Sequence, residues 1–179
     1  MTMNQIVESG MTFGPYPQGH CFFIEKSATY KKIQNNVKIA EFLLLHHSKD
    51  GTPVVWVVEA KSSTPRPATQ PNFDEFIKEI HEKLINAFSL GIAICLKRHN
   101  TNRSELPNIF KTLDLSIASV RFVLVVKGHR EAWLPPLQEA LSKALHSTIN
   151  TKIWNLLPLS VAVINEDLAL KLGLISFIH

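Results

Sequence analysis

The feature that most restricts the fold is a pair of apolar segments separated by a turn. Residues 37–45 read Val-Lys-Ile-Ala-Glu-Phe-Leu-Leu-Leu, and residues 54–58 read Val-Val-Trp-Val-Val. Asp50-Gly51 lies between them and is a typical turn signal, so the two segments predict an antiparallel β-hairpin. Strands that are apolar on both faces belong inside a covered sheet, which predicts helices above and below it.

The remaining segments predict helices and strands around this hairpin. A first helix is expected over residues 21–34. Residues 62–71 contain three prolines and predict a loop. Asn72 then caps a long helix, with Glu75 in the capping-box position and Gly91 at its end. Further along, we expect a strand over 92–96, a polar loop over 97–107, a strand over 121–127, a helix from Pro135-Pro136 to about His146, a strand over 160–164 and a last helix opened by Asn165-Glu166-Asp167. This order predicts an α/β fold with a mixed sheet.

Length and cysteine content narrow the class of protein. The 179 residues suit a single domain spanning 1–179. Residues 1–20, with three glycines and two prolines, are expected to form an irregular N-terminal segment. Cys21 and Cys95 are the two cysteines of the chain, so neither a disulfide framework nor a cysteine-based zinc site can be assembled within it.

The N-terminus and the charge bear on location and partners. Residues 1–5 lack the basic start and apolar core of a signal peptide, and no apolar run reaches the ~20 residues of a membrane helix. We therefore expect a cytoplasmic protein without a membrane partner. The net charge of +4 and the pI near 9.1 permit a polyanionic partner without requiring one.

Three charged residues stand out on the predicted hairpin. Alternation along a strand places Glu59 and Lys61 on the same face. If the turn is centred near Asp50, residues whose numbers sum to about 100 are partners, and Glu41 then faces Glu59. Two carboxylates on an apolar surface repel each other and raise each other's pKa. A divalent cation between them removes both penalties, and oxygen ligands favour Mg²⁺ or Mn²⁺.

These residues resemble the PD-(D/E)xK nuclease superfamily, which has the restriction-endonuclease-like fold. Glu59-Ala60-Lys61 matches the (D/E)xK element on its strand, and Glu41 on the preceding strand matches the first acid. Glu25, on the expected first helix, matches an additional glutamate that many members carry. The resemblance covers about residues 21–96.

The resemblance implies a fold, a cofactor and a reaction. The fold would be a three-layer sandwich with a central mixed sheet flanked by helices. The reaction would be metal-dependent phosphodiester hydrolysis, in DNA more than in RNA, by an Mg²⁺- or Mn²⁺-dependent endonuclease. Glu41, Glu59 and the Ala60 carbonyl would hold the metal, and Lys61 would orient water or stabilise charge on the phosphate. Glu25 would assist through a second metal or a bound water.

The sequence departs from the family pattern in two places. The first acid is preceded by alanine, as Ala40-Glu41, rather than forming Pro-Asp. The Gln-containing helical motif of exonuclease-like members is missing, and Glu79 and Lys83 occupy that region. These departures disfavour the exonuclease subgroup and leave the superfamily resemblance in place.

Basic residues around this region are candidates for contacts with nucleic acid. They are Lys38, Arg66, Lys97, Arg98 and Arg103. Interpretations without a functional site also stay open. Glu59 and Lys61 could form an ordinary ion pair at a solvated strand end, Glu25 could be an exposed helix glutamate, and the basic residues 97–103 could form a solvated loop. A non-catalytic module with the same fold that binds protein or nucleic acid, an RNA-directed nuclease and a homodimer also stay open.

Overall fold

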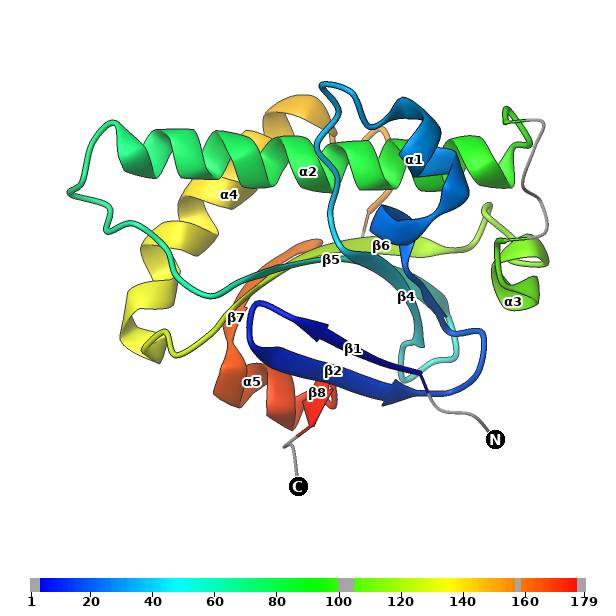
Figure 1. The fold of residues 1–179 in the computed structure, drawn as a ribbon, viewed down its shortest axis with the longest axis horizontal. Helices are drawn as coiled ribbons and strands as arrows, with labels where there is room; N and C mark the ends of the chain where they lie inside the picture. Colours follow the sequence, from blue (N-terminus) through cyan, green and yellow to red (C-terminus); the bar gives the residue numbers. More distant parts are fainter. Residues whose placement is uncertain (1–3, 100–104, 157–158, 177–179) are drawn as a thin grey trace.

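The computed structural model of the chain describes residues 4–99, 105–156 and 159–176 and shows an α/β architecture (Figure 1). A five-stranded sheet lies at its centre, and a three-stranded sheet packs beside it. The strands are β1 (Asn4–Glu8), β2 (Met11–Tyr16), β3 (Cys21–Phe22), β4 (Phe42–His47), β5 (Pro53–Lys61), β6 (Ser119–Val126), β7 (Val161–Asn165) and β8 (Ile175–Ser176). The α-helices are α1 (Ala28–Ile33), α2 (Asn72–Cys95), α3 (Asn108–Lys111), α4 (Leu134–Thr148) and α5 (Glu166–Lys171), and short 3-10 turns are η1 (Ile24–Lys26) and η2 (Glu131–Trp133).

The predicted hairpin is confirmed and forms the middle of the five-stranded sheet. Strands β4 and β5 are antiparallel, and their partners run from Phe42 opposite Val58 to His47 opposite Pro53. The numbers of each pair sum to 100, as the turn near Asp50 predicted. The sheet order is β3-β4-β5-β6-β7, with β5, β6 and β7 parallel to one another, so the sheet is mixed.

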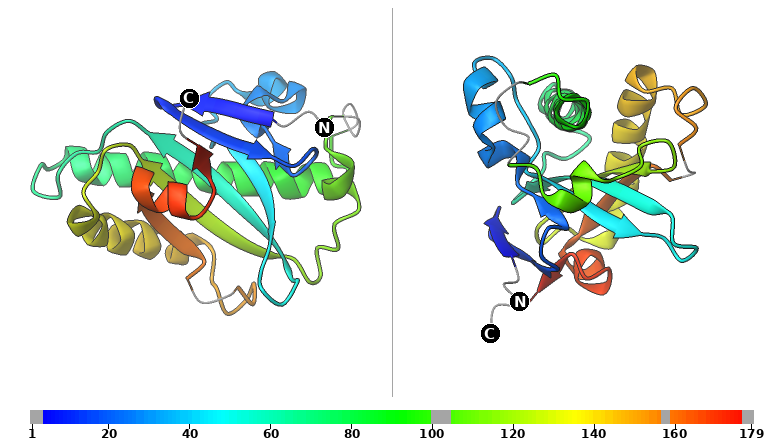
Figure 2. Two further views of the ribbon diagram at one scale, coloured as in Figure 1. Left: turned by 90° about the horizontal axis from the view of Figure 1, so that it is seen from below. Right: turned by 90° about the vertical axis from the view of Figure 1, so that its right-hand side faces the viewer.

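The two faces of this sheet are covered differently, which corrects the expectation of helices on both. Helices α2 and α4 cover one face and enclose the larger apolar core. The three-stranded sheet β1-β2-β8 and the short helix α5 cover the other face and enclose a second core. Figure 2 shows α2 end-on beside α4, with the β1–β2 hairpin on the opposite side of the central sheet. Buried strand residues on both faces explain the nearly continuous apolar runs.

The N-terminal segment is not irregular as predicted. Strands β1 and β2 pair as a hairpin whose turn residues Ser9 and Gly10 have φ of 50° and 73°. Two consecutive residues with positive φ give the backbone twist that suits a tight hairpin turn. Strand β2 then pairs with β8 near the C-terminus. Pairing with β8 buries this segment. Because β8 is distant in the chain, the local sequence of residues 1–20 does not predict the pairing.

The predicted helix over 21–34 is shorter and begins later. Cys21 and Phe22 form a strand that pairs with Leu44 and Leu43 of β4. The helix α1 starts at Ala28, after Ser27, whose side chain accepts a hydrogen bond from the Tyr30 N–H at 3.0 Å. The cap at Ser27 fixes the start of the helix, because it satisfies a backbone donor of the first turn.

The long helix α2 is confirmed, but both of its predicted ends are wrong. Asn72 is the first helical residue rather than the cap, and its side chain makes no capping bond; the Glu75 N–H donates to the Pro71 carbonyl at 3.1 Å instead. Gly91 lies inside the helix, which continues to Cys95 where a strand was expected. A Cβ at Gly91 would lie 2.8 Å from Cδ1 of Leu43. The glycine thus allows α2 to pack closely on β4 rather than ending the helix.

Five further predictions agree with the structure in type and position, whereas the short elements α3, η2 and β8 were not predicted and part of the predicted loop 97–107 lies outside the described residues. Residues 62–71 form a loop, β6 and β7 occupy the expected strands, and α4 begins with prolines in its first turn. The Asn165 side chain caps α5 by accepting from the Leu168 N–H at 3.0 Å. Among the helices in the described ranges, none combines the length and apolar character needed to cross a bilayer.

Candidate functional site

The carboxyl end of β5 holds a buried acid between two lysines. Glu59 is fully buried, and its Oε1 lies 3.3 Å from Nζ of Lys61 and 2.7 Å from Nζ of Lys83. Lys61 therefore shares the face of Glu59, as strand alternation predicted. Burial raises the pKa of Glu59, and the charges of Lys83 and Lys61 oppose that rise. Burial lowers the pKa of Lys83, but the neighbouring acids outweigh burial and leave it raised.

A chain of ion pairs extends from this acid to the surface. The Lys61 amine donates to Oε1 of Glu79 on α2 at 3.0 Å, and the Lys38 amine lies 3.7 Å from the other oxygen of Glu79. The hydrogen bond from Lys61 lowers the pKa of Glu79. Lys61 is 24% exposed while Glu59 is completely covered. The amine of Lys61 is thus anchored by two carboxylates and still reaches solvent.

Glu41 lies one residue before β4, next to the first pair of the β4–β5 ladder. It is 6% exposed, and its Oε2 is buried without a hydrogen-bond partner in the described part of the chain. Burial, the charge of Glu59, a hydrogen bond with the Glu25 side chain and the charges of Glu25 and Glu8 together raise its pKa to about 8. A buried carboxylate without a partner is costly, so this group requires either a proton or a cation.

Glu41 is the centre of a carboxylate cluster. One carboxylate oxygen from each of Glu8, Glu25 and Glu41 lies within 4.8 Å of the other two. The backbone places Glu25 here, since its N–H donates to the Glu41 carbonyl at 3.3 Å. Lys26 lies 3.6 Å from Glu8 and is largely exposed. Within residues 4–99, 105–156 and 159–176, Glu41 forms no ion pair with a basic side chain.

The turn of the N-terminal hairpin is fastened beside this cluster by two hydrogen bonds. The Ser9 hydroxyl donates to the Ala60 carbonyl at 2.9 Å, and the Lys127 amine donates to the Gly10 carbonyl at 2.8 Å. Ala60 lies at the carboxyl end of β5. Lys127 directly follows β6, the neighbouring parallel strand. The two bonds therefore hold Glu8 over the same end of the sheet that carries Glu59.

The predicted basic residues lie in different places. Lys38 joins the site through Glu79. Arg66 lies in the loop after β5 and lines a separate depression with His129 and Trp133. Lys97 and Arg98 follow the end of α2, about 20 Å along the helix from Lys83 at 1.5 Å per residue. The remaining candidate, Arg103, lies outside the described residues.

The sequence reasoning missed three members of the site, namely Glu8, Glu79 and Lys83 as partners of the predicted acids and lysine. For Glu8, the available signal was the turn dipeptide Ser9-Gly10, which lies between Ile6-Val7-Glu8 and Met11-Thr12-Phe13. Glu79 and Lys83 are one helical turn apart, so they share a face of α2. Nothing in the sequence says which strand that face meets.

Comparison of the chain with known protein families, with curated proteins and with solved structures found no match.

The site combines a cluster of carboxylates with a fixed positive group. Glu59 has two lysine partners, whereas no described basic side chain lies within ion-pair distance of Glu41, whose carboxylate clusters with those of Glu8 and Glu25. Three oxygens at this mutual spacing suit a hard divalent cation, which favours carboxylate ligands. Beside them, the amine of Lys61 is placed to meet an anionic group. Such an arrangement can bind a cation and a phosphate together.

Proposed function

We propose that the chain is a metal-dependent phosphodiesterase of the PD-(D/E)xK type that cleaves nucleic acid, DNA in the first place. The observation that carries the proposal is the buried, unpartnered Oε2 of Glu41 within the Glu8–Glu25–Glu41 cluster. The mixed sheet with β4 and β5 at its centre supports the restriction-endonuclease-like fold as the framework. The (D/E)xK triplet at the end of β5 provides the neighbouring acid and lysine.

The residues present fit Mg²⁺ or Mn²⁺. Glu8, Glu25 and Glu41 would hold the ion, and Glu59 would stand next to it as a buried acid fixed by Lys61 and Lys83. This set differs from the predicted ligands Glu41, Glu59 and the Ala60 carbonyl, because the hairpin brings in Glu8 and the Ala60 carbonyl accepts the Ser9 hydroxyl. When bound, the ion would act as a Lewis acid on a phosphate oxygen and lower the pKa of a bound water.

Lys61 would act on the substrate through its partly exposed amine. Two carboxylates hold the amine in place, so little side-chain freedom is lost when a phosphate oxygen approaches it. A fixed positive charge next to the phosphate stabilises the negative charge that develops during hydrolysis. Lys38 lies beyond Glu79 on the same surface and would extend the contact to a neighbouring phosphate of the strand.

The first test measures Mn²⁺ binding by electron paramagnetic resonance or by calorimetry. Wild-type protein is expected to bind one Mn²⁺, and Glu8→Gln is expected to weaken binding by at least about 10-fold, because a charged ligand is removed and even residues that only support ligands have effects of this size. Glu75→Gln at the exposed start of α2 is the matched control and should bind like wild type. Equal binding by wild type and Glu8→Gln would contradict the assignment of this cluster.

The second test is cleavage of single-stranded, double-stranded and branched DNA and of RNA, with Mg²⁺ or Mn²⁺. We expect the Lys61→Met variant to lose about 10²-fold in rate with its Mn²⁺ affinity retained, since its role is toward the phosphate. Cleavage of RNA alone would identify an RNA-directed nuclease. Metal binding without cleavage of any substrate would reject the proposed activity and identify a binding module.

A further inference from the structure

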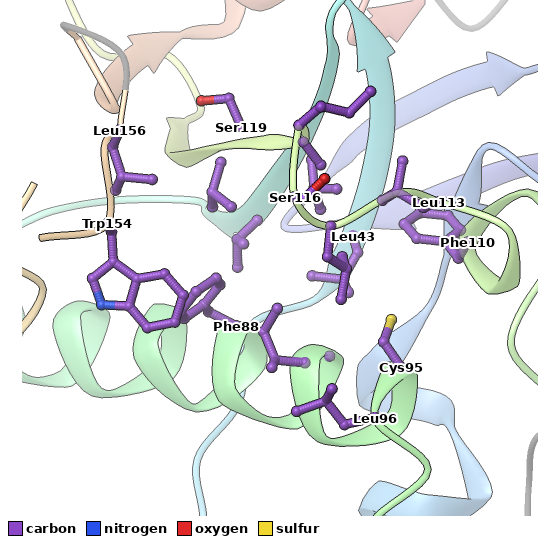
Figure 3. A pocket seen from close by; sticks show the side chains of 18 of the residues that line it. Leu43, Phe88, Cys95, Leu96, Phe110, Leu113, Ser116, Ser119, Trp154 and Leu156 are labelled. Carbon is purple, nitrogen blue, oxygen red and sulfur yellow. The ribbon is translucent and has the colours of Figure 1, made fainter.

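Polar side chains gather on the face of the central sheet that points away from α2, at the amino-terminal end of β5. The strand pairing places His46, Val54 and Ser119 in one row across β4, β5 and β6. Trp56 and Arg121 follow in the next row of the same face, two residues further along their strands. Figure 3, which looks into the apolar groove between α2 and the sheet, shows the Ser119 side chain on the side of β6 away from α2.

The five side chains of these two rows line a small cavity of about 140 Å³. Val54 and Trp56 are buried and give it an apolar base, whereas His46 and Arg121 are half-buried and still reach solvent. Ser119 is 8% exposed. The volume is below the ~300–1,000 Å³ of sites for drug-sized ligands, so the cavity suits a small group.

Two buried polar atoms of this cavity have no hydrogen-bond partner among the described residues. They are the hydroxyl of Ser119 and Nε2 of His46. The His46 ring packs against Trp56, with centroids 4.4 Å apart, and this contact restricts the orientation of the imidazole. A buried polar atom without a partner is unfavourable, so a ligand that forms hydrogen bonds with both atoms would gain affinity.

The charge around the cavity is positive. Arg121 forms no ion pair with a described acid, and its guanidinium carbon lies 5.4 Å from the centre of the Trp56 ring. Burial lowers the pKa of His46, and three basic neighbours lower it further, namely His20, His47 and Arg121. The described residues that line the cavity include no acid. An anionic ligand would therefore supply the counter-charge that Arg121 lacks.

We infer that this cavity binds a phosphate group. The guanidinium of Arg121, the hydroxyl of Ser119 and the Nε2–H tautomer of His46 would donate to its oxygens. His46 and Ser119 lie on the two strands that flank β5, roughly 10 Å apart between backbones at ~4.8 Å per strand spacing. A tetrahedral oxyanion presents oxygens in four directions and can reach donors on both sides, whereas both oxygens of a carboxylate lie on one side of its carbon.

This site lies on the opposite face of the sheet from Glu59, because residues 54 and 56 alternate with 59 along β5. It is independent of the carboxylate cluster and of the proposed nuclease activity. The volume excludes a nucleoside from the cavity itself. The phosphate could thus be the free ion or the terminal group of a nucleotide whose sugar and base remain outside.

The ligand is tested by titrating the full chain with inorganic phosphate at constant ionic strength, followed by NMR. We expect saturable shifts at the Ser119 amide and the Trp56 indole, and at least about tenfold weaker binding of acetate. Adenosine 5′-monophosphate identifies the source: tighter binding than inorganic phosphate indicates a nucleotide, and equal or weaker binding indicates the free ion. Shifts that do not saturate, or adenosine binding as tightly as its monophosphate, would overturn the inference.

Arg121→Gln tests the positive charge and is expected to weaken phosphate binding at least about tenfold. Arg130→Gln is the matched control, because the Arg130 guanidinium also lies over a tryptophan ring, 5.0 Å from the centre of Trp133. Trp133 lines the separate depression beside Arg66. An equal loss of affinity in both variants would show attraction to general positive charge and would reject the cavity as the site.

Two further variants test the hydrogen bonds and do not depend on the folding of Arg121→Gln. Ser119→Ala removes the hydroxyl, and His46→Phe removes Nε2 while keeping a ring against Trp56. Both are expected to weaken phosphate several-fold, and Ser119→Ala should not lower the melting temperature of the phosphate-free protein, because its hydroxyl has no described partner. Wild-type phosphate affinity in both variants would overturn the assignment of these donors.

Discussion

Without divalent cations, the free energy of unfolding should fall as the pH rises from about 4.5 to 8. The pKa of Glu41 is raised from 4.5 to about 8 in the folded chain, first by burial and then by the charge of Glu59 and by Glu25 and Glu8. Between these values the folded state keeps a proton that the unfolded state has released, so stability decreases with pH. The difference in pKa corresponds to on the order of 5 kcal/mol.

Urea unfolding of the cation-free protein at a series of pH values would measure this fall. Glu41→Gln should make the fall smaller, because the amide carries no titrating proton and only the raised pKa of buried Glu59 still contributes. Glu75→Gln, exposed at the start of α2, should keep the wild-type profile. A flat wild-type profile would show that Glu41 is ionised without cost.

Mn²⁺ should reverse the trend above pH 8. The ion binds the deprotonated carboxylates of the folded state, so it adds RT ln(1 + [L]/Kd) to stability once the proton has left Glu41. The added stability should therefore be small at pH 5 and large at pH 8 to 9. The same stabilisation at every pH would contradict competition between Mn²⁺ and the proton on Glu41.

Replacing Lys83 should cost about 3 kcal/mol at neutral pH. Lys83→Met leaves fully buried Glu59 with Lys61 as its remaining lysine partner, and removing one member of a buried ion pair typically costs ~3–5 kcal/mol. The loss should lie at the lower end of this range, because Lys61 still pairs with Glu59 and Glu59 can take up a proton. Unfolding by urea, with Lys78→Met as the exposed control on the same helix, would measure it.

A double variant separates the two possible causes of that loss. Glu59→Gln combined with Lys83→Met removes both charges and should recover a large part of the stability, because no buried carboxylate is left to neutralise. If the double variant is as unstable as Lys83→Met alone, the loss comes from the packing of the lysine stem. Lys83 would then stabilise α2 without a role in holding Glu59.

The hairpin shows how far local sequence information reaches. Alternation along β5 placed Glu59 and Lys61 on one face, and the turn at Asp50 set the pairing of β4 with β5. Both depend on residues close in the sequence, whose geometry follows from the strand period and the turn. By contrast, Gly91 was misread as a helix end, because its reason is the close approach of Leu43 from another element.

The sequence by itself determined the central hairpin, the long helix and the acid–lysine pair at the end of β5. Only the tertiary structure decided what surrounds that pair. Glu8 reaches Glu41 because the N-terminal hairpin is tied to Ala60 and Lys127, and Lys83 reaches Glu59 because α2 crosses the sheet there. These contacts join residues that are distant in the chain. Their formation depends on which apolar faces pack against each other. The periodicity of a single segment predicts that it has an apolar face but does not predict which other face covers it.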